Sequence, residues 1–296
     1  THYVKNHNVK DIEKLTQSNI LFGNIILENL TNMKTKKLSS APLPVVSIGA
    51  LATILILLPF IGLAQRTPWS SFFSILTEHS VRRAITLSLI VATTSALICL
   101  LLGLPLGWIL ARSQNRWIRF LRAAVLLPMV LPPVAGGTAL LFALGRRGFV
   151  GQKLDEWFGI TLPFTTTGAV VAATFVSLPF FVLAIESSLS DLDLDFEESA
   201  MSLGSSPSRT FFTVTIPMIR TGLITGLTLS WARALGEFGA TITFAGDNPE
   251  RTRTLPLELF VALESDPSRA IVLGMIMVTI SLGVLITLRG RWMGQR

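Results

Sequence analysis

The stretch AITLSLIVATTSALICLLLGLPLGWILA, residues 84–111, contains no charged residue. A helix needs roughly 20 mostly apolar residues to cross a bilayer core about 30 Å thick, and this stretch is long enough to do so. It lacks the regular apolar and polar alternation that a lipid-facing barrel strand requires. The stretch therefore predicts a membrane-spanning helix.

Further apolar stretches of similar length follow this pattern on both sides. They occupy residues 44–64, 122–144, 168–189, 221–245 and 269–288. Across the whole chain 50% of residues are hydrophobic and 15% are charged, whereas soluble domains carry about 25% charged residues. We expect an all-α polytopic bundle of about six transmembrane helices in the cell membrane.

The net charge of +7 raises the possibility of a nucleic-acid partner, but the basic residues lie in short loops between apolar stretches. Lys and Arg are enriched in cytoplasmic loops. One group of basic residues falls on a single side if both ends are inside: Lys34, Lys36, Lys37, Arg112, Arg116, Arg119, Arg122, Arg289, Arg291 and Arg296. The other side also receives arginines, so the bias is moderate. We predict that both termini are cytoplasmic and that nucleic acid is not a partner.

Residues 1–32 differ in composition from the rest of the chain and are rich in asparagine. Met33 is followed by three lysines within four residues, which is typical of a membrane protein whose translation starts there and whose N-terminus is cytoplasmic. We expect residues 1–32 to be a non-native or poorly ordered extension, and residues 33–296 to form the membrane domain. The alternative is a short amphipathic helix at residues 15–30 that lies on the membrane.

Enzyme signatures are missing from this sequence. It contains neither HExxH nor GxSxG, and it has no GxxxxGK[ST] loop to cradle a nucleotide. Its single cysteine, Cys99, cannot form a disulfide within the chain and is expected to be a small buried residue. We expect no catalytic residue, no metal site and no cofactor in this chain.

Residues 190–217, SDLDLDFEESAMSLGSSPSRTFFTVTIP, are too polar to enter lipid. Asp195 and Glu198 have the spacing of a capping box, and Gly204 suits the left-handed position that ends a helix. Ser206 then caps a second helix that begins at Pro207. Two short helices with an apolar face predict a cytoplasmic docking surface for another protein, or else a segment that packs under its own bundle.

Arg233 and Glu237 fall inside the apolar stretch 221–245, one helical turn apart. A charge in mid-membrane costs about 2.5–3.5 kcal/mol on insertion scales, so such residues face a bundle interior, a wet cavity or each other. The pair predicts either a structural contact between helices or a passage in which Arg233 attracts an anion and Glu237 prevents tight trapping.

The stretch LLPMVLPPVAGGTALLF, residues 126–142, is rich in helix-breaking residues. Non-helical backbone at membrane depth is tolerated where it is buried in protein or lines a cavity. We expect a break or kink among Pro128, Pro132, Pro133, Gly136 and Gly137. We place Pro132, Pro133 and Gly136 near a constriction or hinge of a pathway; the alternative is a packing kink.

Several of these motifs resemble one family. The series Glu198-Ser199-Ala200, Gly204 and Pro217 resembles the EAA loop of ABC importer permeases, with Ser199 where the family usually has alanine. ARALGEFGAT, residues 232–241, resembles the fifth-span signature of molybdate and sulfate permeases. LPPVAGG, residues 131–137, is more similar to the molybdate branch.

This resemblance implies a type I ABC importer permease that carries an oxyanion, molybdate or tungstate. The implied partners are a second copy of the chain, cytoplasmic ABC ATPase subunits docked at residues 190–217, and an extracytoplasmic oxyanion-binding protein. We expect the translocation pathway to be lined by Pro132, Pro133, Gly136, Arg233, Glu237 and Thr241.

The two external loops, residues 145–167 and 246–267, are candidates for contact with the binding protein. Arg146, Arg147 and Glu258 are the polar side chains expected to make it. Two alternatives to the molybdate reading remain. They are a sulfate or thiosulfate ABC permease, and an ion-gradient-driven secondary transporter, which would not need an ATPase dock.

Overall fold

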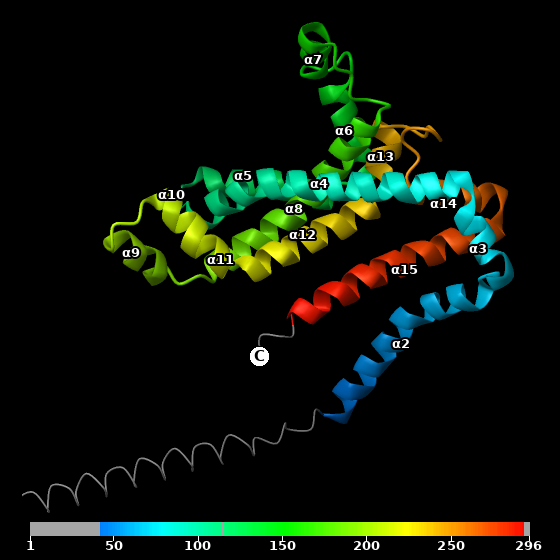
Figure 1. The fold of residues 1–296 in the computed structure, drawn as a ribbon, viewed down its shortest axis with the longest axis horizontal. Helices are drawn as coiled ribbons and strands as arrows, with labels where there is room; N and C mark the ends of the chain where they lie inside the picture. The colour runs from blue at the N-terminus through cyan, green and yellow to red at the C-terminus, as the bar shows by residue number, and fades with distance from the viewer. Residues whose placement is uncertain (1–41, 114, 293–296) are drawn as a thin grey trace, which may run out of the picture. The chain divides into compact units, whose positions relative to one another are not determined.

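The computed structural model describes residues 42–113 and 115–292, and every regular element in those ranges is helical (Figure 1). The helices are α2 (Leu43–Arg66), α3 (Trp69–Thr77), α4 (His79–Arg112), α5 (Trp117–Val130), α6 (Pro133–Leu144), α7 (Gly151–Phe158), α8 (Thr166–Ser190), α9 (Asp195–Ser202), α10 (Pro207–Thr210), a π-helix (Phe211–Thr215), α11 (Ile216–Met218), α12 (Arg220–Leu235), α13 (Gly239–Phe244), α14 (Leu255–Ser265) and α15 (Pro267–Trp292). The all-α prediction is confirmed. The predicted extension and its alternative, the amphipathic helix, lie outside the described residues.

Four of the described helices are long and apolar enough to cross a membrane, namely α2, α4, α8 and α15. Two bent pairs raise that number to six if each pair is one span: α5 with α6, bent by 118°, and the α10–α11 segment with α12, bent by 72°. The prediction of about six spans therefore agrees with the fold. The predicted span 221–245 is not one helix, because α12 ends at Leu235 and α13 begins at Gly239.

The chain divides into two units between Pro59 and Phe60. The described part of the first unit is residues 42–59, of which 43–59 belong to α2. The second unit begins at Phe60 and contains all the other described helices.

Helices α4, α8 and α12 lie side by side and form the core of the second unit (Figure 1). Glycines make this close packing possible. A side-chain carbon on Gly107 of α4 would lie 2.8 Å from Cγ2 of Ile185 in α8, and one on Gly226 of α12 would lie 3.0 Å from the Phe181 ring. Small residues at helix contacts are typical of membrane bundles, where close backbone approach replaces the hydrophobic effect as the packing force.

Helix α4 directs small residues inward and large apolar residues outward. Ala92 and Cys99 are fully buried, whereas Leu97 and Leu101 are 58% and 73% exposed. This distribution suits a helix surrounded by lipid, which solvates leucine as well as a protein core does. The prediction that Cys99 is a small buried residue is confirmed.

Candidate functional site

Two interrupted helices meet in the second unit. The first interruption separates α5 from α6 at residues 131–132, and the second separates α12 from α13 at residues 236–238. Helix α6 packs directly against α13 (Figure 1). A side-chain carbon on Gly239 would lie 2.8 Å from Cβ of Pro133, so the lack of a side chain at position 239 lets the two breaks come this close.

Adjacent prolines cause the first interruption. Leu131 has φ −65° and ψ 137° and Pro132 has φ −53° and ψ 133°, the extended backbone that a following proline favours. Pro133 then occupies the first turn of α6, where its missing N–H costs nothing. The predicted break is confirmed at Pro132 and Pro133. It does not extend to Pro128, which lies inside α5.

Arg233 and Glu237 form an ion pair across the end of α12. Nη1 of Arg233 lies 2.6 Å from Oε2 of Glu237, and the two side chains are 27% and 1% exposed. The expected proximity is confirmed, but the expected single helix is wrong, because Glu237 follows the end of α12 at Leu235. Gly236 is the first residue of the break and Gly239 directly follows it, and the low helix propensity of glycine favours an interruption here.

Glu237 also stabilises the start of α13. Its Oε1 accepts a hydrogen bond from the backbone N–H of Ala240 at 2.8 Å. The first N–H groups of a helix have no partner within the helix, and a carboxylate is a strong acceptor for them. One buried carboxylate therefore joins the cation of α12 to the first turn of α13.

The other predicted pathway residues take different positions around this junction. Gly136 is buried in α6, where a side-chain carbon would meet the Phe175 ring at 3.1 Å. Thr241 in α13 is 1% exposed, and its hydroxyl finds no hydrogen-bond partner among the described residues. Pro132 and Pro133 are exposed at the junction's surface. Whether these side chains touch a passing ion stays a prediction.

Helix α9 and the residues after it form the predicted cytoplasmic segment. Glu198 and Ser199 are exposed and Ala200 is half-buried. Phe196 and Leu203 are 55% and 90% exposed, so an apolar face is present and uncovered in this single chain. A shallow groove beside this face is lined by Asp195, Glu198, Ser199, Ser202 and Leu203.

The local caps of this segment are mostly as predicted. Gly204 has φ +88°, the left-handed conformation expected after a helix. The Ser206 hydroxyl accepts from the N–H of Arg209, and Pro207 begins α10. The predicted capping box is wrong: the N–H of Asp195 is bonded to Oδ1 of Asp193, because the aspartate two residues earlier forms a local turn. Pro217 lies in the single turn of α11.

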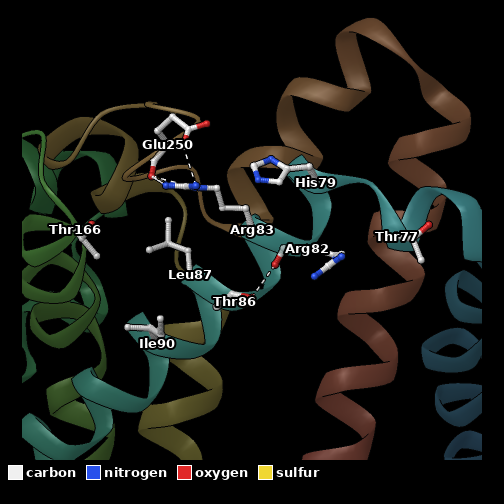
Figure 2. A pocket seen from close by; sticks show the side chains of 9 residues that line it. All are labelled: Thr77, His79, Arg82, Arg83, Thr86, Leu87, Ile90, Thr166 and Glu250. Carbon is white, nitrogen blue, oxygen red and sulfur yellow. Dashed lines mark hydrogen bonds and ion pairs between the residues drawn. The ribbon is translucent and has the colours of Figure 1, made fainter.

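The His79 end of α4 borders an open pocket of about 570 Å³ (Figure 2). The lining residues come from the end of α3, from α4, from the start of α8 and from the 246–254 loop: Thr77, His79, Arg82, Arg83, Thr86, Leu87, Ile90, Thr166 and Glu250. Figure 2 shows Arg83 directed to Glu250, while Arg82 points to the other side of α4. Within the described residues, Arg82 has no acidic side chain within ion-pair distance.

A chain of alternating charges links α14, α15 and the 246–254 loop near the same end. Glu258 contacts Arg269 at 2.5 Å and Arg253 at 3.6 Å. Arg253 holds Asp247 through two bonds of 2.6 and 2.9 Å, and Arg269 reaches Glu78 at 3.4 Å. The hydrogen bond to Asp247 raises the pKa of Arg253.

This charge chain changes the interpretation of Glu258. The sequence suggested an exposed contact for a binding protein, but Glu258 is 5% exposed and is held by two arginines. Its partners lie on other elements, so no helical spacing in the sequence reveals them. Arg146 remains an exposed loop side chain, 3.9 Å from Asp155.

In the described part of the chain, no three His, Cys, Asp or Glu side chains gather into a possible metal site. The arrangement instead offers a partly accessible cation at a helix break. Such a cation can attract an anion within the membrane interior.

Residues 103–296 match the family model described as "Binding-protein-dependent transport system inner membrane component". The molybdenum transport system permease protein ModB of Mycobacterium tuberculosis is 41% identical over 238 residues, which cover 80% of this chain and 90% of that protein. The probable sulfate transport system permease protein cysT of Zygnema circumcarinatum is 33% identical over 237 residues, covering 79% and 82%.

The fold is also found among solved structures. A chain from the crystal structure of a bacterial alginate ABC transporter, in complex with a periplasmic protein bound to alginate pentasaccharide, aligns with a TM-score of 0.66. The alignment covers 82% of this chain and 92% of that chain at 16% identity. At that identity the likeness concerns the fold alone.

Proposed function

Because the chain belongs to the family of binding-protein-dependent transport system inner membrane components, we propose that it forms the membrane pathway of an ATP-driven molybdate importer. Membership in this family makes the chain a multi-pass membrane permease subunit of an ABC importer. This subunit is not itself an enzyme. The ATPase and the substrate-binding protein are separate partners of such a permease. The identity of the ion and the role of each residue are the proposed part.

The observation that supports an anionic substrate is the Arg233–Glu237 ion pair, which lies where the two helix breaks meet. Arg233 retains 27% of its side-chain surface, whereas Glu237 is nearly fully buried. The accessible partner is therefore the cation. A pathway ion must be attracted and then released, and the neighbouring carboxylate keeps the local charge from becoming a trap.

The relatives guide the choice among oxyanions. Identity to the molybdenum permease is 41%, against 33% for the sulfate permease, over similar lengths. Molybdate, tungstate and sulfate are tetrahedral dianions, so Arg233 would attract each of them. Discrimination among them is assigned mainly to the binding protein, because a pathway works through weak contacts.

The cytoplasmic ATPase subunit would dock on α9 and the turn that follows it. Glu198, Ser199 and Leu203 are exposed there beside a groove, and Gly204 ends the helix in the left-handed conformation. An apolar face with an acidic centre suits a partner surface that presents apolar and basic side chains. Pro217 would mark the return of the chain to the membrane.

The orientation of the other segments in the membrane follows from the placement of α9 in the cytoplasm. With α9 in the cytoplasm, the His79 end of α4 faces outward, together with the 246–254 loop and the loop 145–167. These segments would receive the oxyanion-binding protein. Two copies of the chain would form the pathway between them, with both termini in the cytoplasm. Residues 33–296 would constitute the permease domain.

Uptake of labelled molybdate tests the proposal. Cells would express the chain with its ATPase and binding protein, and tungstate or sulfate would be added as competitor. Competition by tungstate and not by sulfate supports the molybdate assignment. Competition by sulfate favours the second candidate, a sulfate or thiosulfate permease, which the cysT relative supports. Uptake that persists without ATP would instead indicate a gradient-driven carrier.

A further inference from the structure

Arg112, the last residue of α4, holds the proposed docking helix. Its Nη2 donates to Oε1 of Glu197 in α9 at 3.0 Å, and the two side chains are only 17% and 16% exposed. The buried hydroxyl of Thr215, in the π-helix, donates to the same carboxylate oxygen at 2.7 Å. Glu197 therefore joins three elements.

This contact differs from an ordinary surface ion pair. Both side chains are largely removed from solvent, so the loss of one partner would leave the other charge partly buried and unpaired. Glu197 and the exposed Glu198 are neighbours, yet they point to different surroundings: one binds α4 and the other is free for a partner protein.

The opposite end of α4 is fixed in a similar way. Nη1 of Arg83 lies 2.8 Å from Oε2 of Glu250, and Arg83 also donates to the Glu250 carbonyl at 3.1 and 2.5 Å (Figure 2). One turn further along the helix, the buried Ser88 hydroxyl accepts from the N–H of Leu255 at 2.7 Å. The 246–254 loop and the first residue of α14 are thus both attached to α4.

Helix α4, which carries both attachments, is continuous for 34 residues, about 50 Å at 1.5 Å per residue. It packs against α8 and α12 along the core. A displacement of α9 would therefore act on the Arg112 end of a long packed helix whose other end carries the 246–254 loop.

We propose that α4 transmits movement of the docked ATPase to the outer loop, with Glu197 and Arg112 as positioning residues. The inference rests on the proposed docking of an ATPase at α9. Glu198 would make the contact with the ATPase, whereas Glu197 would pass the resulting movement of α9 to α4. The two neighbouring carboxylates then have separable roles in docking and in transmission.

The test uses the complete complex in lipid, with Arg251→Cys as a reporter in the 246–254 loop. Arg251 is exposed, and the only other cysteine of the chain, Cys99, is fully buried. The rate of thiol labelling therefore measures the accessibility of position 251 in the loop. ATP should change the labelling rate by at least about fivefold, the lower end of usual coupling factors between sites. Arg112→Glu and Glu197→Arg should each abolish the change while the ATPase still co-purifies.

The double variant Arg112→Glu/Glu197→Arg restores opposite charges and should recover the ATP-dependent change. Three results would overturn the inference: a full response in either single variant, loss of ATPase association in Arg112→Glu, or no recovery in the double variant. A loop that does not respond to ATP in the unsubstituted complex would overturn it as well. Labelling that responds normally while molybdate uptake fails would overturn the proposed substrate and leave the transmission intact.

Discussion

Glu237 makes two interactions, of which the sequence indicates only one. The sequence indicates a partner for Arg233, while the fold shows that the same carboxylate also accepts the N–H of Ala240. A residue that both neutralises a cation and caps a helix is costly to remove, because two groups lose their partner. Its charge and its hydrogen-bonding capacity can nevertheless be separated by substitution.

Glu237→Gln keeps a side-chain oxygen for Ala240 and removes the negative charge. We expect normal abundance in the membrane but altered transport, because Arg233 then attracts the anion without an opposing charge. Glu237→Ala loses the hydrogen bond too and should destabilise the chain by about 1–3 kcal/mol, the usual cost of an unsatisfied buried group. Abundance and molybdate uptake, measured together, distinguish the two. Equal loss of abundance in both variants would show that the charge and the hydrogen bond of Glu237 do not have separate roles.

Arg233→Ala should reduce uptake more than abundance, since 27% of the Arg233 side chain remains accessible and available to an ion. Arg233→Lys, which keeps the charge, is the matched control and should retain part of the uptake. Uptake normalised to immunoblotted protein is the measurement. If abundance falls in proportion to uptake, Arg233 serves the structure alone.

Gly239 sets the distance between the two broken helices. Gly239→Ala places a carbon 2.8 Å from Cβ of Pro133, and neither group can rotate away, so α6 and α13 must separate. We expect a cost of about 1–3 kcal/mol from overpacking and a strong loss of uptake. Gly236→Ala is the control, because its new carbon meets its nearest neighbour at 3.8 Å. Thermal unfolding of both purified variants checks the difference.

Helix α9 presents an apolar face that no described part of the chain covers. Phe196 in this helix of eight residues and Leu203, which directly follows it, are more than half exposed, although the helix is held in place by Glu197. A short polar helix of this kind gains little stability from propensity and depends on tertiary contacts. Its fixed position with an open apolar face is the physical argument for a protein partner.

Glu198→Arg reverses the charge at the centre of this face. We expect loss of ATPase co-purification with the permease still inserted in the membrane, because Glu198 makes no ion pair with the described residues that the substitution would break. Ser202→Ala, a nearby exposed substitution on the same groove, should leave co-purification unchanged. Unchanged association of Glu198→Arg would remove α9 as the docking element.

Across the whole second unit, ion pairs gather at the two ends of the bundle, and apolar packing fills the middle. Arg112–Glu197 and Arg122–Glu186 secure one end, and the chain from Asp247 to Glu78 secures the other. This distribution places charges where water or headgroups can solvate them. The Arg233–Glu237 pair lies apart from both groups, at the helix break.

Glu258→Ala removes the central carboxylate of the outer charge chain. Breaking a buried ion pair costs about 3–5 kcal/mol. We expect the lower end of this range, because Arg253 retains Asp247 and Arg269 retains Glu78 as an ion-pair partner. A lower Tm of the purified complex is the predicted result. Glu264→Ala, on the exposed side of α14, should leave the Tm unchanged. Equal Tm values for the two variants would show that the charge chain adds no stability.

The sequence by itself determined the helical membrane class, the positions of the apolar stretches, the break at Pro132 and Pro133, and the left-handed turn at Gly204. These are local consequences: apolar length, ring constraints on φ and the missing side chain of glycine act within a few residues. The sequence also indicated that Arg233 and Glu237 are close, since they are neighbours along the chain.

Only the tertiary structure decided what these local features contact. It ended α12 at Leu235, made Glu237 the cap of α13, buried Glu258 between two arginines and brought Arg112 to Glu197 across 85 residues of chain. The reason is physical: each depends on the packing of separate helices, which glycines such as Gly107 and Gly239 bring within contact distance. No periodicity in a single segment encodes such contacts.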